Sequence, residues 1–129
     1  MNLDKKAPLG NGGRPNLVSG CPLTAALAAI GGKWKLIIVY WLAESPKHFA
    51  ALKREMSGIS QKVLTQQLRE LESDGLVKRT PTGAIPAPVE YSLTEYGLSV
   101  LPLLENVRTW GRGHIERFSP AKATGSGAK

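Results

Sequence analysis

The sequence predicts a mostly α-helical fold of the α+β class, a winged helix-turn-helix with an additional helix at each end. Residues 58–80 have the pattern of an amphipathic helix that ends at a glycine and is followed by a strand. Residues 81–88 are rich in proline and separate two strand-like segments, which is typical of a β-hairpin wing. The expected order is helix, helix, short strand, helix, helix, strand, wing, strand and long helix.

The first half of the chain predicts three helices and a short strand. Pro22 suits the first turn of a helix that runs to about Ile30. A second helix over residues 33–43 is apolar almost all round, which indicates burial on several sides. Residues 47 and 48 are expected to form a very short strand, and residues 49–56 a third helix.

The fourth helix, expected over residues 60–74, is the most informative segment. Ser60 is a suitable N-cap residue, and Gly75 is a suitable residue to end the helix. Leucines at 4- and 3-residue spacing place one apolar stripe along the helix. The stripe consists of Leu64, Leu68 and Leu71.

The opposite face of this helix carries side chains that can bind nucleic acid. They are Ser60, Gln61, Lys62, Thr65, Gln66 and Arg69. Glutamine can make two hydrogen bonds to adenine and arginine two to guanine, whereas the lysine is expected to contact phosphate. We therefore expect this face to contact DNA. The other interpretation is an ordinary solvated helix face.

The wing is expected between two strands, residues 76–80 and 89–93, in which apolar and polar residues alternate. Lys78 and Arg79 lie at the root of the wing. Their side chains either bind DNA phosphates or face solvent, and the sequence leaves both interpretations open.

The last helix is expected to run from a cap at Thr94 to Phe118. Pro102 lies inside it and should either kink the helix or mark the start of its regular part. The helix has more apolar surface than one small domain can cover, so we expect a homodimer. The expected dimer contacts are Leu23, Leu27, Val107, Trp110, Ile115 and Phe118.

Composition and charge indicate one domain with a polyanionic partner. The 129 residues are 42% hydrophobic, which is enough for one core. The net charge is +7, and its excess is centred on residues 33–79, which hold nine basic and five acidic residues. Residues 1–18 are expected to form a flexible arm, residues 19–118 the domain, and residues 119–129 a disordered tail.

Other classes of protein are not indicated. The longest apolar run, residues 36–43, is too short to span a bilayer, and no signal peptide is visible. A single cysteine permits no internal disulfide, so a cytoplasmic protein is expected. His48 and His114 are too far from other ligand types to predict a metal site. Nothing in the sequence recommends an enzyme or a cofactor.

Several short motifs occur together in the order and at the spacing of one family. They are Cys21-Pro22, Ile30-Gly-Gly-Lys-Trp-Lys35, Gly58-Ile-Ser-Gln-Lys62, Leu64-Thr-Gln-Gln-Leu-Arg-Glu-Leu71, Asp74-Gly-Leu-Val77, Val89-Glu-Tyr-Ser-Leu-Thr94 and Trp110-Gly111. On this set, which covers about residues 21–117, the chain resembles the HxlR family of bacterial transcriptional regulators. The resemblance implies a DNA-binding homodimer whose terminal helices pair across a two-fold axis. It also implies that the fourth helix enters the major groove.

The chain departs from the family pattern near the wing. It has Pro88 where a basic residue is usual, Thr82 where an aromatic residue is common, and His48 where arginine is usual. These departures concern the contact of the wing with the DNA backbone. They leave the fourth helix unchanged.

Cys21 directly precedes Pro22 at the start of a helix, where the helix dipole and free amides favour a thiolate. The family resemblance implies that this cysteine could sense oxidants or electrophiles such as quinones. The other interpretation is a small apolar residue that packs in the dimer interface.

These observations predict a sequence-specific transcriptional regulator, a repressor that binds a pseudo-palindromic operator in double-stranded DNA as a homodimer. The expected inducer is an oxidant that acts at Cys21 or a small molecule. The alternative is a winged-helix module that binds protein and reads no bases. The two differ in salt dependence, because contacts between cations and phosphates weaken steeply as salt rises.

Overall fold

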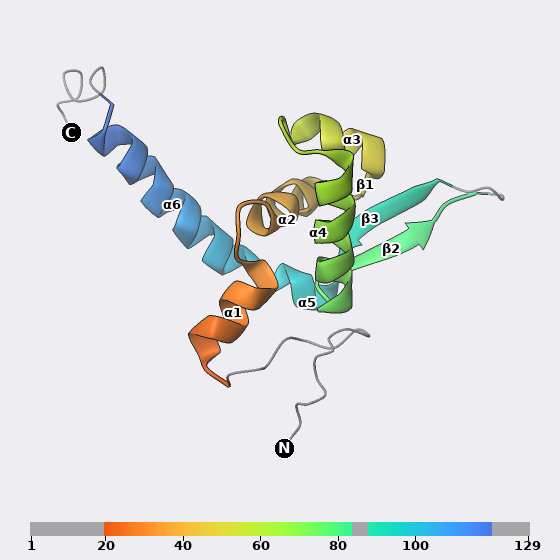
Figure 1. Cartoon of the computed structure of the whole chain (residues 1–129), viewed down its shortest axis with the longest axis horizontal. Coiled ribbons are helices and arrows are strands. Elements are labelled where there is room, and N and C mark those ends of the chain that lie inside the picture. The colour runs from red at the N-terminus through yellow and green to blue at the C-terminus, as the bar shows by residue number, and fades with distance from the viewer. Residues whose placement is uncertain (1–19, 84–87, 120–129) are drawn as a thin grey trace.

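The structure, a computed structural model, describes residues 20–83 and 88–119 and confirms the predicted fold class (Figure 1). In chain order the elements are α1 (Pro22–Ile30), α2 (Lys35–Glu44), β1 (Lys47–His48), α3 (Phe49–Glu55), α4 (Gln61–Ser73), β2 (Val77–Pro81), β3 (Val89–Leu93), α5 (Glu95–Leu98) and α6 (Leu101–Arg117). The arm expected over residues 1–18 lies outside the described residues, as does the expected tail apart from Ser119.

Helices α1 to α4 begin and end close to the predicted positions. The largest difference is at α2, which begins at Lys35 rather than at residue 33. Gly32 takes a positive φ of 80°, and the two residues after it continue the turn, so the helix starts later.

Helices α2 and α4 form the centre of the hydrophobic core. Ile38 and Val39 of α2 and Leu64 of α4 are fully buried, with no exposed surface. The apolar stripe predicted for α4 is confirmed, since all three of its leucines are buried. The buried hydrophobic residues are Ile30, Ile38, Val39, Leu42, Leu52, Met56, Ile59, Leu64, Leu68, Leu71, Leu76, Val77 and Leu104.

Three short strands form an antiparallel sheet in the order β1-β3-β2. β2 and β3 pair along their whole length, with Val77 opposite Leu93 at the base of the hairpin. β1 pairs with the other edge of β3 and places His48 opposite Glu90. The β2–β3 hairpin extends away from the helices as the predicted wing (Figure 1).

The prediction of one helix from Thr94 to Phe118 is wrong. The one-turn helix α5 is followed by a turn at residues 99 and 100 and then by α6. In an uninterrupted helix the nitrogen of Pro102 would face the carbonyl of Leu98, and proline has no N–H to donate. The chain therefore starts a new helix with Pro102 in its first turn, which is the second of the two expected outcomes.

The short helix α5 is fixed against the end of α4. The hydroxyl of Thr94 accepts a hydrogen bond from the amide of Gly97 at 2.9 Å and donates one to the carbonyl of Gly75 at 2.6 Å. Gly97 lies so close to Leu76 that a Cβ at this position would clash with the Leu76 carbonyl oxygen. These contacts set the direction in which the chain enters α6.

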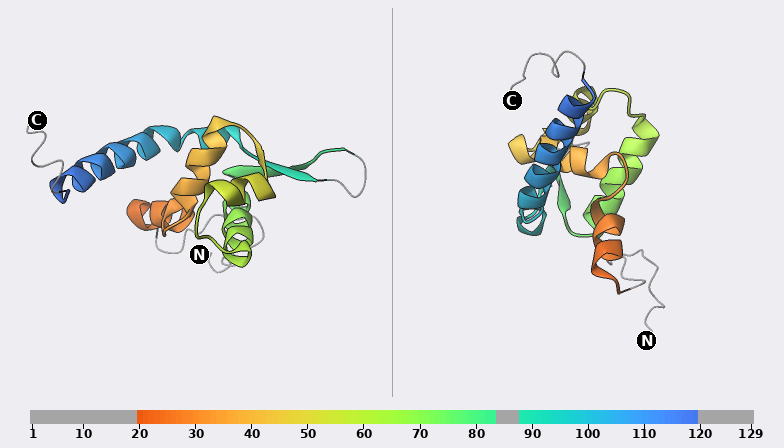
Figure 2. Two further views of the ribbon diagram at one scale, coloured as in Figure 1. Left: turned by 90° about the horizontal axis from the view of Figure 1, so that it is seen from above. Right: turned by 90° about the vertical axis from the view of Figure 1, so that its left-hand side faces the viewer.

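Helices α1 and α6 lie on the side of the molecule opposite to the wing (Figures 1 and 2). α6 extends beyond the body of the domain, and among its residues only Leu104, near its start, is buried. The wing, which carries Lys78 and Arg79 at its root, is therefore far from the two helices that carry the expected dimer contacts.

Candidate nucleic-acid interface

Both ends of α4 are capped. At the start of the helix the amide of Val63 donates to the hydroxyl of Ser60 at 3.1 Å, as predicted. At the other end Gly75 has a φ of 81°, and the amide of Leu76 donates to the carbonyl of Leu71 at 3.0 Å, as in a Schellman motif. The caps give hydrogen-bond partners to backbone groups at the two ends of α4. The ends of the helix are therefore protected from fraying.

The polar side of α4 forms one continuous strip, which we term the reading face. It consists of Gln61, Lys62, Thr65, Gln66 and Arg69, which together line a shallow, open depression. All are exposed except the half-buried threonine. The structure thus brings together the residues predicted for this helix, apart from the N-cap serine, whose hydroxyl accepts the capping hydrogen bond.

A second depression lies between the N-terminal half of α4 and the base of the wing. It is lined by Gln61, Thr65 and Arg79 together with His48, Phe49, Ala50, Pro88, Val89 and Tyr91. Lys78 does not line this depression, because successive residues of a strand point to opposite faces. The structure therefore separates the two cations predicted at the root of the wing, and Arg79 is the one beside α4.

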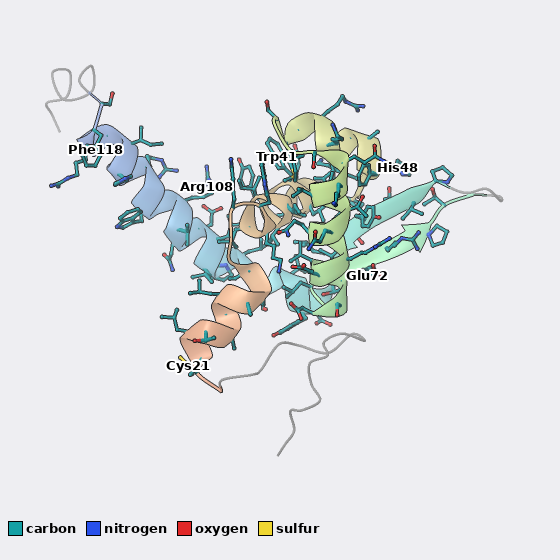
Figure 3. All side chains as sticks on the ribbon, viewed as in Figure 1. Cys21, Trp41, His48, Glu72, Arg108 and Phe118 are labelled. Atoms are coloured by element: carbon teal, nitrogen blue, oxygen red, sulfur yellow. The ribbon has the colours of Figure 1, made fainter. Side chains whose placement is uncertain are left out.

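His48 also lines this depression, although the sequence did not predict it as a site residue. Its Nδ1 lies 3.0 Å from the carbonyl oxygen of Val89, and since a carbonyl can only accept, Nδ1 carries a proton. Figure 3 shows His48 where α3 meets the wing. The departure from the family's usual arginine marked position 48 in the sequence, but the contact with Val89 could not be predicted, because the two residues are 41 positions apart and meet through strand pairing.

One buried ammonium and two carboxylates lie beside the reading face. Lys35 is 7% exposed, and its Nζ lies 2.7 Å from Oε1 of Glu70 and donates to the carbonyl of Ala28 at 3.1 Å. The hydrogen bond from Lys35 lowers the pKa of Glu70, so this carboxylate is ionised at neutral pH. Burial raises the pKa of Asp74, the C-cap residue of α4.

The residues predicted for the dimer interface are all exposed in the single chain. Exposed fractions run from 47% for Val107 to 70% for Trp110. The other members of this set are Leu23, Leu27, Ile115 and Phe118. His114 joins them, because its ring stacks on Trp110 at 4.9 Å and meets Phe118 edge-on at 5.0 Å. The i, i+4 spacing of these three rings could have indicated His114 from the sequence.

An apolar groove runs from this surface toward the core between α2 and α6. It is lined by Leu36, Ile37, Tyr40, Leu104, Val107 and Arg108. Ile37 and Tyr40 are 37% and 39% exposed, so α2, which was expected to be buried on several sides, is open on the groove side. The guanidinium of Arg108, labelled in Figure 3, lies 5.2 Å from the centre of the Tyr40 ring, and both residues line the groove.

Cys21 is exposed and occupies the N-cap position of α1, as predicted. The Thr24 side chain, followed by the amides of Thr24 and Leu23, stabilises the thiolate by hydrogen bonding and lowers the pKa of Cys21. Figure 3 shows Cys21 at the free end of α1, far from His48 and the wing. Any reaction of the Cys21 thiol would therefore take place on the side of the molecule formed by α1 and α6.

Residues 20–83 and 88–119 hold neither a cluster of metal ligands nor a single helix that could span a membrane. No group of three or more metal-ligating side chains is found in these ranges. No single helix there is long and apolar enough to cross a membrane, and only α1 and α2 together reach the required length and hydropathy, as a pair bent by 65°.

A family model described as HxlR-like helix-turn-helix matches residues 29–119. The chain belongs to the HxlR-like helix-turn-helix family. The HTH-type transcriptional regulator YtcD of Bacillus subtilis is 48% identical over 93 residues, which are 72% of this chain and 74% of YtcD. This HxlR-like protein is thus a transcriptional regulator of the helix-turn-helix type.

Solved structures of two other regulators have the same fold. The redox regulator HypR, in its oxidised form, is 43% identical with a TM-score of 0.69, over 72% of this chain and 96% of HypR. The transcriptional regulator YodB of B. subtilis, in its reduced form, is 29% identical with a TM-score of 0.64, over 78% of this chain and 94% of YodB. YodB has also been solved after treatment with diamide.

The cap at Ser60 gives a first prediction. Ser60→Ala is expected to lower the free energy of unfolding by about 0.5 to 2 kcal/mol, because the amide of Val63 loses its acceptor. Ser60→Asp should keep the stability, since aspartate is an equally good N-cap. Urea denaturation followed by circular dichroism measures both variants. Equal stability of wild type and Ser60→Ala would show that this hydrogen bond contributes nothing.

Proposed function

We propose that this HxlR-like regulator binds a pseudo-palindromic DNA operator as a homodimer in the cytoplasm and acts as a repressor. The observation that carries the proposal is the reading face of α4. It presents five polar side chains, two of them cationic, on a capped helix whose opposite side is buried. A helix of this kind can enter the major groove without losing its own packing.

The position of each side chain suggests its role in the proposed complex. Gln66 and Arg69 are the proposed base contacts, because glutamine and arginine can each make paired hydrogen bonds to a base edge. Lys62 is proposed to contact phosphate. Arg79 lies across the second depression from α4 and is proposed to bind the DNA backbone beside the major groove. Lys78, on the other face of the hairpin, is expected to contribute less.

The proposed dimer uses the exposed apolar surface of α1 and α6. Five of its six predicted residues are more than half exposed in the single chain, which is a large apolar area to leave in water. α1 and α6 lie opposite to the wing (Figure 2), and we propose that a second subunit bound there leaves the reading face open. Two paired subunits would present two copies of α4, which accounts for the proposed pseudo-palindromic operator.

We further propose that Cys21 makes DNA binding sensitive to oxidants. Its exposure and lowered pKa favour the reactive thiolate. Similarity to the redox regulator HypR supports this role. Because the chain has one cysteine, oxidation could give a Cys21–Cys21 bridge between subunits, a mixed disulfide or an adduct. A packing role for Cys21 in the dimer interface is the competing interpretation.

The reading face gives the second prediction. Gln66→Ala or Arg69→Ala is expected to weaken specific DNA binding by about 1 to 3 kcal/mol, because each change removes hydrogen bonds to a base edge. Gel-shift titration of a duplex that the wild type selects from a randomised library measures the effect, with circular dichroism to verify the fold. Arg112→Ala, which removes an exposed charge from α6, is the matched control.

Unchanged affinity in both reading-face variants would contradict the assignment of these residues. The salt dependence of the wild type separates the two candidate functions. A regulator that contacts several phosphates should lose affinity steeply as salt rises, whereas a module that only binds protein would select no duplex from the library.

The third prediction concerns the dimer. Trp110→Ala is expected to weaken self-association by about 2 kcal/mol, or roughly thirtyfold, because a large exposed aromatic side chain is a typical centre of an interface. Analytical ultracentrifugation over a range of concentrations measures the dissociation constant. Tyr96→Ala is the control, since Tyr96 is 65% exposed but lies on α5. A wild type that sediments only as a 13.9 kDa species would refute the dimer.

The fourth prediction concerns Cys21. Wild type is expected to release its selected duplex after treatment with diamide or a quinone, and Cys21→Ser to bind before and after treatment. Thr24→Val should raise the pKa of Cys21 and slow its alkylation at neutral pH, because less thiolate is present. The pH dependence of alkylation by iodoacetamide measures this shift. If mass spectrometry shows complete Cys21 modification and DNA binding is unchanged, the thiol is structural.

A further inference from the structure

Lys35 connects three helices through one buried ammonium. Its Nζ donates to the carbonyl of Ala28 in the last turn of α1 and lies 2.7 Å from Oε1 of Glu70 in α4. The lysine itself belongs to the first turn of α2. A buried charge that has lost its water is stabilised only by such partners, so these contacts strongly restrict where the carboxylate of Glu70 can lie.

The second oxygen of Glu70 reaches the reading face. Oε2 accepts a hydrogen bond from Nε2 of Gln66 at 3.3 Å, one helical turn away. An ionised carboxylate can only accept, so the nitrogen end of the Gln66 amide must face Glu70. The amide oxygen then points the other way. An isolated surface glutamine has no such constraint and can present either end.

We propose that Lys35 and Glu70 are positioning residues that fix the amide orientation of Gln66 for base recognition. This inference rests on the proposed DNA-reading function of α4. Because Glu70 accepts one N–H of the Gln66 amide, the amide cannot flip. Its oxygen and its second N–H then face a base in one fixed order, acceptor and donor. Adenine offers N6 as donor and N7 as acceptor in the major groove, which this order matches when the two edges are aligned.

The competing explanation is that the Lys35–Glu70 pair only fastens α4 to α2. The two explanations differ in how Glu70 and Gln66 depend on each other. If the pair only holds α4 against α2, mutation of Glu70 should change the affinity for DNA whether or not Gln66 is present. A positioning role acts through Gln66, so its effect should vanish once that side chain has been removed.

The experiment is a double-mutant cycle on the duplex that the wild type selects from a randomised library. Gln66→Ala should identify the base pair at which discrimination is lost. Glu70→Gln should reduce discrimination at that same base pair by about threefold to tenfold and leave the others unchanged. Adding Glu70→Gln to Gln66→Ala should cause no further loss. Lys35→Met should reproduce the pattern of Glu70→Gln.

Glu44→Gln is the matched control, because it removes an exposed carboxylate of α2 whose ion-pair partner, Lys47, lies on β1 and not on α4. Loss of affinity that is equal at every base pair, or that persists without Gln66, would overturn the inference. A wild type that selects no sequence would overturn the proposed function and this inference together.

A measurement on unmodified protein avoids any dependence on how the variants fold. Nuclear magnetic resonance relaxation of side-chain amides should show that Gln66 is more ordered than Gln61, which shares the exposed reading face. Equal mobility of the two amides without DNA would also overturn the inference.

Discussion

The burial of one side of α4 is the constraint on which the rest of the structure depends. Leu64, Leu68 and Leu71 are at most 1% exposed and belong to the same core as α2. Because these leucines occupy one side of the helix, the polar residues between them can only lie on the other side. The reading face therefore stays at the surface without contributing to the core, and its residues are free to serve binding.

The end of α4 also fixes the wing. The turn at Gly75 leads directly into β2, and the hydroxyl of Thr94, just after β3, donates to the carbonyl of Gly75. Reading helix and hairpin therefore share one hydrogen-bonded base. In the proposed complex, Arg79 and the reading face would approach DNA as one unit, which gives the fixed geometry that recognition of a groove requires.

The same helix is connected to the side of the molecule proposed for dimerisation and sensing. Cys21 begins α1, and the last turn of α1 contacts Lys35 through the carbonyl of Ala28. Lys35 in turn holds Glu70 of α4. Within the proposed dimer, a displacement of α1 would thus reach the reading helix through a short path of direct contacts, in addition to the shared hydrophobic core.

The sequence by itself determined the elements whose signals are local: the caps and leucine stripe of α4, the proline at the start of α1, and the hairpin around the wing. Only the tertiary structure decided that α5 and α6 are separate, that Arg79 rather than Lys78 faces α4, and that His48 and Lys35 lie beside the candidate site. The positions of Arg79, His48 and Lys35 depend on contacts between residues far apart in the chain, whereas the break before α6 is one of the two outcomes that Pro102 left open. Periodicity and capping report a residue's neighbours along the helix or strand, not the elements that pack against it.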